Sequence, residues 1–211
     1  MTVSLSLYED RLSASHSLAW PAAVRGIYVR SGQVRMASGN DTTEMTQGQC
    51  RLFTQSLSLS GDAEIWTFEV SAQSVASLSK QADLRLILSH DIDLNATKPL
   101  VLRCDHVAFP PSIETPKHGH KAAGIRRLVT GRLIAEIGNE SRRIDAGEAW
   151  YESGHEPVVG RTLAADSAFV RAMVLPTRLH GKPTFVAWDE TAAAQPRGTT
   201  RTQFFDTIIQ L

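Results

Sequence analysis

Short apolar segments separated by turn residues run along most of the chain. Five segments rich in β-branched or aromatic side chains cover residues 27–30, 34–37, 65–70, 133–137 and 169–175. Dipeptides typical of tight antiparallel turns lie beside them: Ser31-Gly32, Gly39-Asn40, Ser60-Gly61, Thr130-Gly131 and Gly138-Asn139. Many short strands at this spacing are typical of a β-sandwich or a β-barrel. The pattern therefore predicts an all-β protein built from antiparallel strands.

Three further segments interrupt or extend this pattern. We expect one helix, over residues 71–82, because Val75, Leu78 and Ala82 recur at helical spacing. In the tail, strand-like segments cover residues 184–188 and 203–209. We expect them to close a barrel edge or to pair with another barrel, since an open terminal edge invites association.

The chain contains an internal duplication. Gly32 and Gly48 are separated by sixteen residues, and so are Gly131 and Gly147; the offset between the two pairs is 99 in both cases. A fixed internal period is strong evidence on architecture, because each copy forms one structural unit.

The duplication predicts two antiparallel barrels of about 100 residues each. The Gly-Ile segment that begins at residue 26 resembles the one that begins at residue 124. We therefore expect an N-terminal barrel over residues 1–72, a linker over 73–98 and a C-terminal barrel over 99–211.

Composition narrows the function classes. Basic and acidic residues balance at 22 each, and the basic residues form no run, which argues against nucleic acid or an anionic membrane as a partner. No apolar stretch is long enough to span a bilayer, and the N-terminal residues do not resemble a signal peptide. Two cysteines are too few for a disulfide framework. We expect a cytoplasmic protein that acts on a small molecule, as a homodimer.

The sequence His118-Gly-His120 carries the main chemical signal. Positions i and i+2 of a strand face the same side, so both imidazoles can point at one metal ion inside a barrel. With Gly131 after it, this segment resembles the first motif of the cupin superfamily, in which two such histidines are followed by a glutamate and, six residues later, a glycine. The resemblance implies a bicupin fold and a divalent metal in the C-terminal barrel.

Gly124 stands where most metal-binding cupins carry that glutamate. In this respect the segment is similar to the ring-cleaving gentisate and salicylate dioxygenases, which hold Fe(II) with three histidines. The resemblance implies Fe(II), with Zn, Mn or Ni as alternatives, and makes Arg126 an anchor for a substrate carboxylate. Strand parity independently places Arg126 on the same face as His120. An arginine inside a barrel keeps its charge and needs an anionic partner. The alternative is an arginine at the barrel rim, paired with Glu136 or Glu148.

The sequence allows two positions for the third metal ligand. Counted from Gly147 without gaps, the histidine of the second cupin motif falls on Val158, whereas His155 lies three residues earlier. His155 becomes the third ligand only if the turn at Ser153-Gly154 is shortened.

Without His155, the histidine pair needs help from Glu152, Glu114 or His106. Trp150 and Glu152 share one face of their expected strand, so Glu152 can face inward. The N-terminal repeat has no equivalent site, because Trp20, Ala22 and Ser56 occupy its matching positions. We expect that barrel to be structural or a dimerisation surface.

Three functions fit these residues. The first is an Fe(II) dioxygenase of a small aromatic or carboxylate substrate, oriented by Arg126. The second is a metal-dependent hydrolase, lyase or isomerase in which Glu152 or His106 transfers the proton. The third is a non-catalytic barrel that binds a small molecule through a degenerate site. The position of His155 decides between the first and the third.

Overall fold

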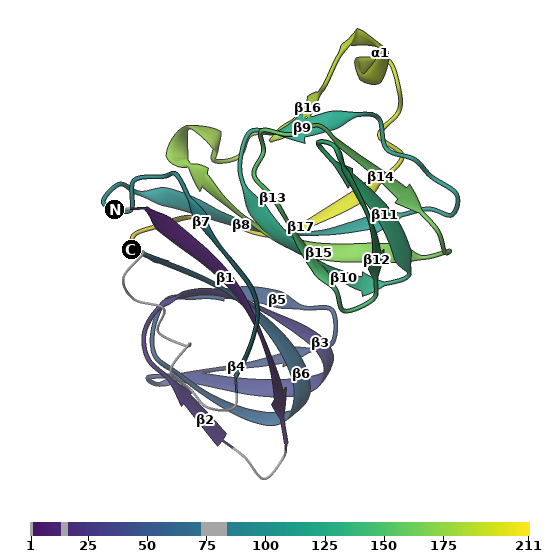
Figure 1. The fold of residues 1–211 in the computed structure, drawn as a ribbon. Coiled ribbons are helices and arrows are strands. Elements are labelled where there is room, and N and C mark those ends of the chain that lie inside the picture. Colours follow the sequence, from purple (N-terminus) through teal and green to yellow (C-terminus); the bar gives the residue numbers. More distant parts are fainter. Residues whose placement is uncertain (1, 14–16, 73–83) are drawn as a thin grey trace. The chain divides into compact units, whose positions relative to one another are not determined.

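The computed structural model describes residues 2–13, 17–72 and 84–211, and these are mostly β-strand (Figure 1). The chain divides into two compact units. The N-terminal unit comprises Met1–Leu100 with Ile209–Leu211, and the C-terminal unit comprises Val101–Ile208. The expected all-β antiparallel fold is confirmed.

The N-terminal unit is a single seven-stranded sheet. Its strands are β1 (Val3–Leu12), β2 (Ser17–Trp20), β3 (Val24–Ser38), β4 (Asp41–Thr46), β5 (Cys50–Phe53), β6 (Leu57–Ala72) and β7 (Arg85–Ile92). They run in the order β4-β3-β6-β1-β7, while β2 pairs with β6 and β5 pairs with β3. Alternate residues of the strands fill an apolar core that includes Trp20, Ile27, Met36 and Ile65.

The C-terminal unit has two five-stranded sheets. One has the order β13-β10-β15-β8-β17 and the other β12-β11-β14-β9-β16. The first sheet contains β8 (Leu100–Phe109), β10 (Gly124–Thr130), β13 (Ala149–Glu152), β15 (Ser167–Pro176) and β17 (Thr200–Ile209). The second contains β9 (His118–His120), β11 (Arg132–Ile137), β12 (Glu140–Asp145), β14 (Val158–Thr162) and β16 (Phe185–Ala187). Core residues from both sheets pack together, among them Val107, Trp150 and Phe169 with Leu133 and Ile144.

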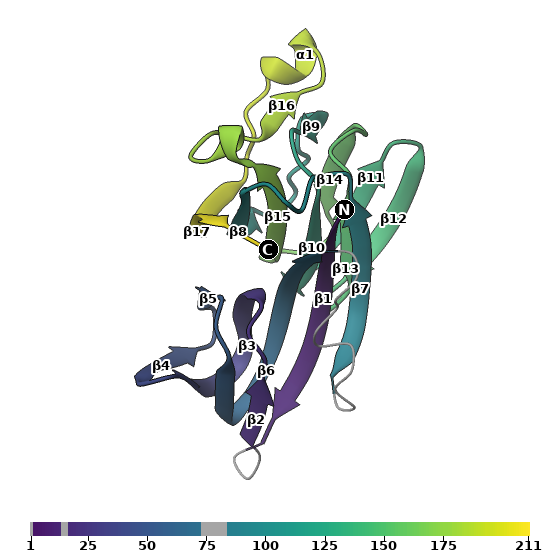
Figure 2. The same cartoon turned by 90° about the vertical axis from the view of Figure 1, so that its left-hand side faces the viewer.

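Two short helical segments complete the C-terminal unit, η2 (Thr177–Leu179) and α1 (Glu190–Ala193). Both views of the ribbon show α1 and β16 next to β9 at one end of this unit (Figures 1 and 2). The tail strands expected from the sequence are present as β16 and β17. They pair with β9 and β8 at the edges of the two sheets.

The duplication is confirmed by hydrogen bonds at the predicted offset. The amide of Gly48 donates to the carbonyl of Val29 at 2.9 Å, and the amide of Gly147 donates to that of Leu128 at 2.8 Å. The register to the neighbouring strand shifts just after Val29 on β3 and just after Leu128 on β10. All four residues are related by 99 positions, so the two units repeat one backbone plan.

The repeated glycines are required by this plan. Gly32 and Gly131 have φ of +76° and +80°, and Gly48 and Gly147 have +85° and +89°. This left-handed region favours glycine. A side chain at Gly32 or Gly131 would also collide with the facing strand.

The strand register corrects the match between Gly26 and Gly124. Arg25 pairs with Phe53 and Gly124 pairs with Glu152, both related by 99 residues, so Arg25 takes the place of Gly124. The match by Gly-Ile identity is wrong by one residue because cross-strand pairing, and not residue identity, defines equivalent positions.

The same shift moves the positions that match His118 and His120 from Trp20 and Ala22 to Ala19 and Pro21. These residues have no side-chain donor atoms either. The N-terminal unit therefore has no counterpart of the histidine pair at these positions.

The expected linker carries a strand. Residues 85–92 form β7, which pairs antiparallel with β1 and belongs to the N-terminal unit. Residues 71 and 72 end β6, and the rest of the helix expected over 71–82 lies outside the described residues. Leu7 and Leu88 face each other in the β1–β7 register, so this segment extends the sheet.

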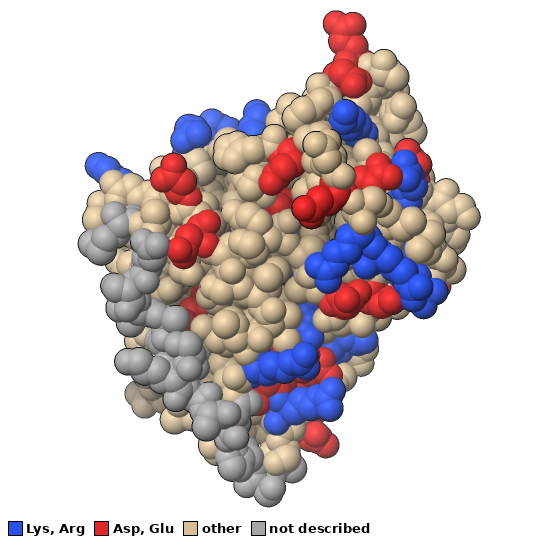
Figure 3. All heavy atoms as spheres, in the orientation of Figure 1, with Lys and Arg blue, Asp and Glu red and all other residues tan. Residues whose placement is uncertain are grey.

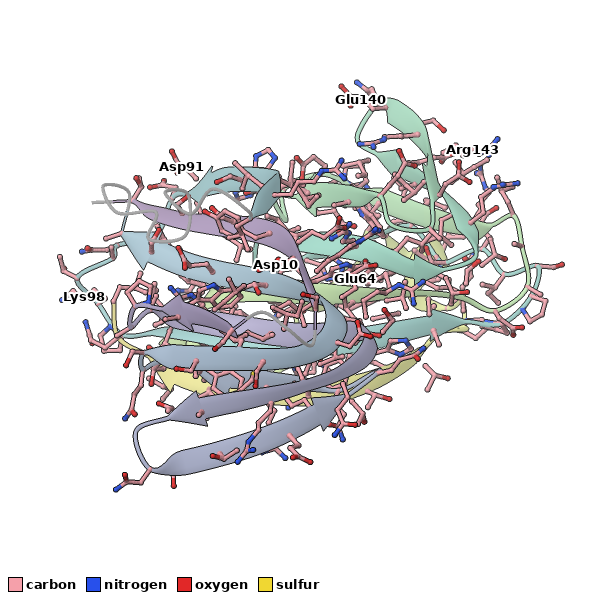
Figure 4. All side chains as sticks on the ribbon, turned by 90° about the horizontal axis from the view of Figure 1, so that it is seen from below. Asp10, Glu64, Asp91, Lys98, Glu140 and Arg143 are labelled. Atoms are coloured by element: carbon pink, nitrogen blue, oxygen red, sulfur yellow. The ribbon has the colours of Figure 1, made fainter. Side chains whose placement is uncertain are left out.

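No helix of the described residues is long and apolar enough to cross a membrane. Basic and acidic side chains lie next to one another on the face seen in Figure 3. Glu140 and Arg143 project outward from the β11–β12 hairpin in Figure 4.

Candidate functional site

A cavity of about 150 Å³ lies between the two sheets of the C-terminal unit. Apolar side chains form most of its wall, among them Val107, Phe109, Leu133, Ala135, Val158 and Phe169. Its polar lining comprises Thr115, His118, His120, Arg126, Glu152, Arg171, Arg197, Thr199 and Arg201. The wall thus offers a hydrophobic surface together with charged groups.

Strand β9 aims both motif histidines into this cavity. His118 and His120 are 8% and 9% exposed, and their ring centroids lie 5.0 Å apart with the rings nearly perpendicular. This geometry agrees with the strand-parity argument. The Nδ1–H of His118 can donate to the carbonyl of Pro116 at 2.8 Å. That tautomer leaves the Nε2 lone pair of His118 available to a ligand.

Both imidazoles are held in the neutral form. Burial lowers the pKa of His118, and it lowers the pKa of His120 well below its ordinary value. The positive charges of Arg126 and Arg171 lower both pKa values further. Nδ1 of His120 has no hydrogen-bond partner in the described part of the chain. Neutral imidazoles are the form that binds a metal or accepts a proton.

The structure does not bring His155 to this pair. His155 is exposed in the turn after β13 and does not line the cavity, and its backbone amide donates to Ser153 Oγ at 3.1 Å. Val158 is buried, lines the cavity and lies directly opposite His118 in the β14–β9 register. The expectation of a third histidine ligand is therefore corrected.

The reason lies in the turn. Gly154 has φ of +90° and packs against the carbonyl of His120, where a Cβ would come within 2.7 Å of the oxygen. The turn keeps its full length, so the ungapped count from Gly147 to Val158 holds.

Glu152 faces inward, as strand parity predicts, but its carboxylate is already engaged. Oε2 lies 2.6 Å from Nη2 of Arg126 and 3.5 Å from Nε2 of His120. Oε1 accepts a hydrogen bond from Nε1 of Trp150 at 2.9 Å. The carboxylate therefore neutralises a buried guanidinium and also approaches His120.

Arg126 is fully buried, so it is not at the barrel rim. Besides the ion pair with Glu152 it donates to the carbonyl of Gly124 at 2.6 Å. Burial lowers the pKa of Arg126 to about 10, and the negative charge of Glu152 opposes this effect. The guanidinium is charged at neutral pH. The partners considered for a rim position, Glu136 and Glu148, pair with other arginines.

A protein-only centre with three ligands does not fit these residues. Among the described residues, no three His, Cys, Asp or Glu side chains form a group that could hold a metal ion. The two histidines fit as a pair of ligands, since their imidazoles are neutral and face one cavity. Any further coordination would have to come from a bound molecule.

The remaining sequence candidates lie away from the cavity. Glu114 is 57% exposed and pairs with Arg161 at 2.5 Å. His106 is partly buried but does not line the cavity. Neither residue contributes to the site.

Sequence reasoning missed Arg171. In the β10–β15 register Arg171 lies directly opposite Arg126, and its guanidinium contacts the carboxylate of Asp105 at 3.0 Å. Arg171 is 7% exposed and Asp105 is fully buried. The sequence could have indicated this residue, because Arg171 is the single arginine within the apolar run 169–175. A charge in a buried strand needs a partner.

No family model matches the sequence, and no curated protein is significantly similar to it. Solved structures are similar in fold. A cupin 2 conserved barrel domain protein from Leptotrichia buccalis has a TM-score of 0.53 at 11% identity, over 82% of this chain and 84% of that one. This chain has a two-barrel cupin fold.

Two enzymes share that fold. A variant of oxalate decarboxylase from Bacillus subtilis has a TM-score of 0.60 at 9% identity, over 92% of this chain and 73% of that one. A variant of salicylate 1,2-dioxygenase from Pseudoaminobacter salicylatoxidans, in complex with gentisate, has a TM-score of 0.55 at 10% identity. The match covers 81% of this chain and 68% of that one. Identities this low establish the fold alone.

In the C-terminal cupin barrel the space beside Gly124 is filled. A Cβ at Gly124 would collide with the carbonyl of Ala172 and would lie 2.7 Å from Cγ of Met173. The glycine therefore leaves no room for a larger side chain at this position. It permits the close approach of β15.

Stacked side chains form part of the cavity wall. The ring of Phe185 on β16 stacks on His118, with centroids 4.7 Å apart and planes inclined by 15°. The guanidinium of Arg197 lies 4.0 Å from the centroid of Phe185. A layer of arginine, phenylalanine and histidine thus borders the cavity.

Proposed function

We propose that the C-terminal cupin barrel binds a small organic carboxylate. The observation that carries the proposal is the position of Arg126 and Arg171, which face each other across β10 and β15 on the wall of one cavity. Like charges directly opposite each other repel, and Asp105, the carboxylate that pairs with Arg171, also contacts Arg201. A carboxylate bound between the two guanidinium groups would relieve this repulsion and could accept bidentate hydrogen bonds.

The size and wall of the cavity suit a compact ligand body. An apolar cavity of about 150 Å³ in another protein accepts a molecule as small as benzene. The cavity in this protein has a similar volume, and the rings of Phe109 and Phe169, with centroids 5.6 Å apart, form part of its wall. We infer a ligand with one apolar ring or a short branched chain attached to the carboxylate.

Titration calorimetry with benzoate and its uncharged isostere benzamide tests this proposal. Benzoate should bind at least about tenfold more tightly, which corresponds to roughly 1.4 kcal/mol. Arg126→Lys keeps the charge that neutralises Glu152 but loses the planar fork, so it should fold and bind benzoate about tenfold more weakly. Arg142→Lys, at an exposed pair on β12, is the matched control and should bind as the unchanged protein does. Equal affinity for benzoate and benzamide, or full affinity in Arg126→Lys, would contradict the proposal.

A second candidate is a metal-dependent enzyme, of which an Fe(II) dioxygenase is the specific form expected from the sequence. The observation that favours it is the free Nε2 of His118 beside the neutral His120. Fe(II) held there would supply coordination positions for O₂ and a substrate carboxylate.

Metal analysis of the purified protein, with and without benzoate, tests the second candidate. Metal should be retained by the unchanged protein and by His155→Ala, and lost from His118→Ala/His120→Ala. Oxygen consumption by Fe(II)-loaded protein with salicylate or gentisate would then support the dioxygenase. Equal metal content in the double variant would reject the metal site and leave carboxylate binding intact.

A further inference from the structure

The cavity wall carries more positive than negative charge. Four arginines line it, Arg126, Arg171, Arg197 and Arg201. Two carboxylates pair with them, Glu152 on the wall and Asp105 behind it. Counted over the guanidinium and carboxylate groups alone, four positive charges face two negative ones, which leaves a surplus of two positive charges. A single bound carboxylate would neutralise only half of that surplus.

The arginines form two pairs that differ in depth. Arg126 and Arg171 are buried. Arg197 and Arg201 are exposed and border the same cavity, and the side chain of Arg201 is 45% exposed. A ligand that enters from solvent would therefore meet one pair of guanidinium groups near the outside and another inside.

The outer pair has less anionic compensation than the inner pair. Asp105 contacts Arg201 at 3.4 Å, but it also contacts Arg171 at 3.0 Å, so one carboxylate serves two guanidinium groups. Arg197 has no ion pair among the described residues, and its guanidinium stacks on the ring of Phe185. That stack holds the guanidinium one aromatic layer away from His118.

We infer that the ligand carries two acidic groups, one bound by Arg126 and Arg171 and the other by Arg197 and Arg201. The ligand class is a short dicarboxylate with an apolar middle. This inference rests on the proposed carboxylate-binding function and specifies its ligand. Exposed arginines alone would indicate only a solvated surface. Here the shared cavity wall and the fixed stack of Arg197 favour a binding role.

Titration of the full chain with matched acids tests the inference. Butyrate and succinate have four carbons each, and only succinate has a second carboxylate. Benzoate and phthalate form the corresponding pair with an aromatic ring. The diacid of each pair should bind at least about tenfold more tightly than the monoacid, since an added charge-assisted contact is worth more than a neutral one.

Variants at Arg197 identify the outer group. Arg197→Ala should weaken succinate binding about tenfold and leave butyrate within about twofold, because only the second carboxylate loses its partner. Arg197→Lys keeps the positive charge and should therefore bind succinate nearly as tightly as the unchanged protein does. If Arg197 served only to stack on Phe185, the lysine variant would bind succinate as weakly as Arg197→Ala does. Arg143→Ala on β12, whose side chain is 56% exposed, is the control and should change neither.

Three outcomes would count against the inference, and they are distinguishable. Equal affinity for mono- and diacids in the unchanged protein overturns it while carboxylate binding stands. A diacid preference that survives both Arg197→Ala and Arg201→Ala removes the outer pair from the site. Failure of every acid to bind rejects the proposed function itself.

Discussion

Val158 on β14 lies directly opposite His118 on β9, and both side chains face the cavity of the C-terminal cupin barrel. In the second cupin motif, counted without gaps from Gly147, this is the position of a histidine. The barrel thus keeps the backbone that would deliver a third imidazole and places an apolar side chain on it. One residue thus separates this pair of histidines from a set of three histidines facing the cavity.

Val158→His should therefore create a metal site. Directly opposed residues of an antiparallel pair point to the same face, so the new imidazole would join His118 and His120. We expect Co²⁺ or Zn²⁺ affinity to rise by about a hundredfold or more over that of the unchanged protein, because three histidines suffice for a metal centre. Titration of metal-free protein, followed by the visible spectrum of bound Co²⁺, measures this.

Val159→His is the matched control for that experiment. Val159 is the next residue on β14 and faces the other side of the strand, so it should leave metal affinity unchanged. An equal gain in both variants, or no gain in Val158→His when the variant is folded by circular dichroism, would contradict the assignment of Val158 to the ligand position.

Much of the fold was predictable because glycine spacing records backbone geometry. Gly32, Gly48, Gly131 and Gly147 all adopt positive φ, so their offset of 99 residues reports a repeated set of turns. Strand parity likewise predicted the inward direction of His118 and His120, since the period of two is fixed by the pleat.

The partners in the site were less predictable because they come from different strands. The pairing of Arg126 with Glu152 depends on the register between β10 and β13, which local sequence does not specify. The third ligand depended on whether the turn at Gly154 was shortened. The pairing of Val158 with His118 in the β14–β9 register decides this, and local sequence does not specify that register.

Gly124→Ala should destabilise the barrel. The added Cβ would collide with the backbone of Ala172 and crowd Met173, and overpacking of this kind costs about 1 to 3 kcal/mol. Gly119→Ala is the control on β9, where the nearest atom would be 3.7 Å from the new Cβ. Urea unfolding should show a large loss for the first variant and a small one for the second. Equal stability of the two would show that β15 can yield at this point.

Acid should destabilise the metal-free protein through the histidine pair. Folding lowers the pKa of His118 and His120, so the neutral form is favoured in the folded state. The associated stability is present above the unfolded pKa of about 6.5 and is lost as pH falls below it. The unfolding free energy of the unchanged protein should therefore decrease from pH 7.5 to 5.5.

Removal of the two imidazoles should flatten that dependence. His118→Gln/His120→Gln should lose less stability over the same interval in urea unfolding, because glutamine does not titrate. His155→Ala is the control, because His155 is exposed in the turn after β13 and does not line the cavity. An unchanged slope in the double variant would show that other groups, and not this pair, are protonated on unfolding.

Glu152→Gln should destabilise the barrel more than loss of one hydrogen bond would. Arg126 is fully buried and keeps its charge at neutral pH, so removal of the opposing carboxylate leaves that charge without compensation. Breaking a buried ion pair from one side typically costs about 3 to 5 kcal/mol, whereas replacing both partners with apolar residues is often neutral.

The double variant Arg126→Met/Glu152→Leu should therefore be more stable than Glu152→Gln. A double-mutant cycle by urea unfolding, made of Arg126→Met, Glu152→Leu and the double variant, measures the coupling, with Arg142→Ala at an exposed pair as control. If the single and double variants lose stability additively, the pair does not act as a unit, and the charge of Arg126 must be balanced by another group in the cavity.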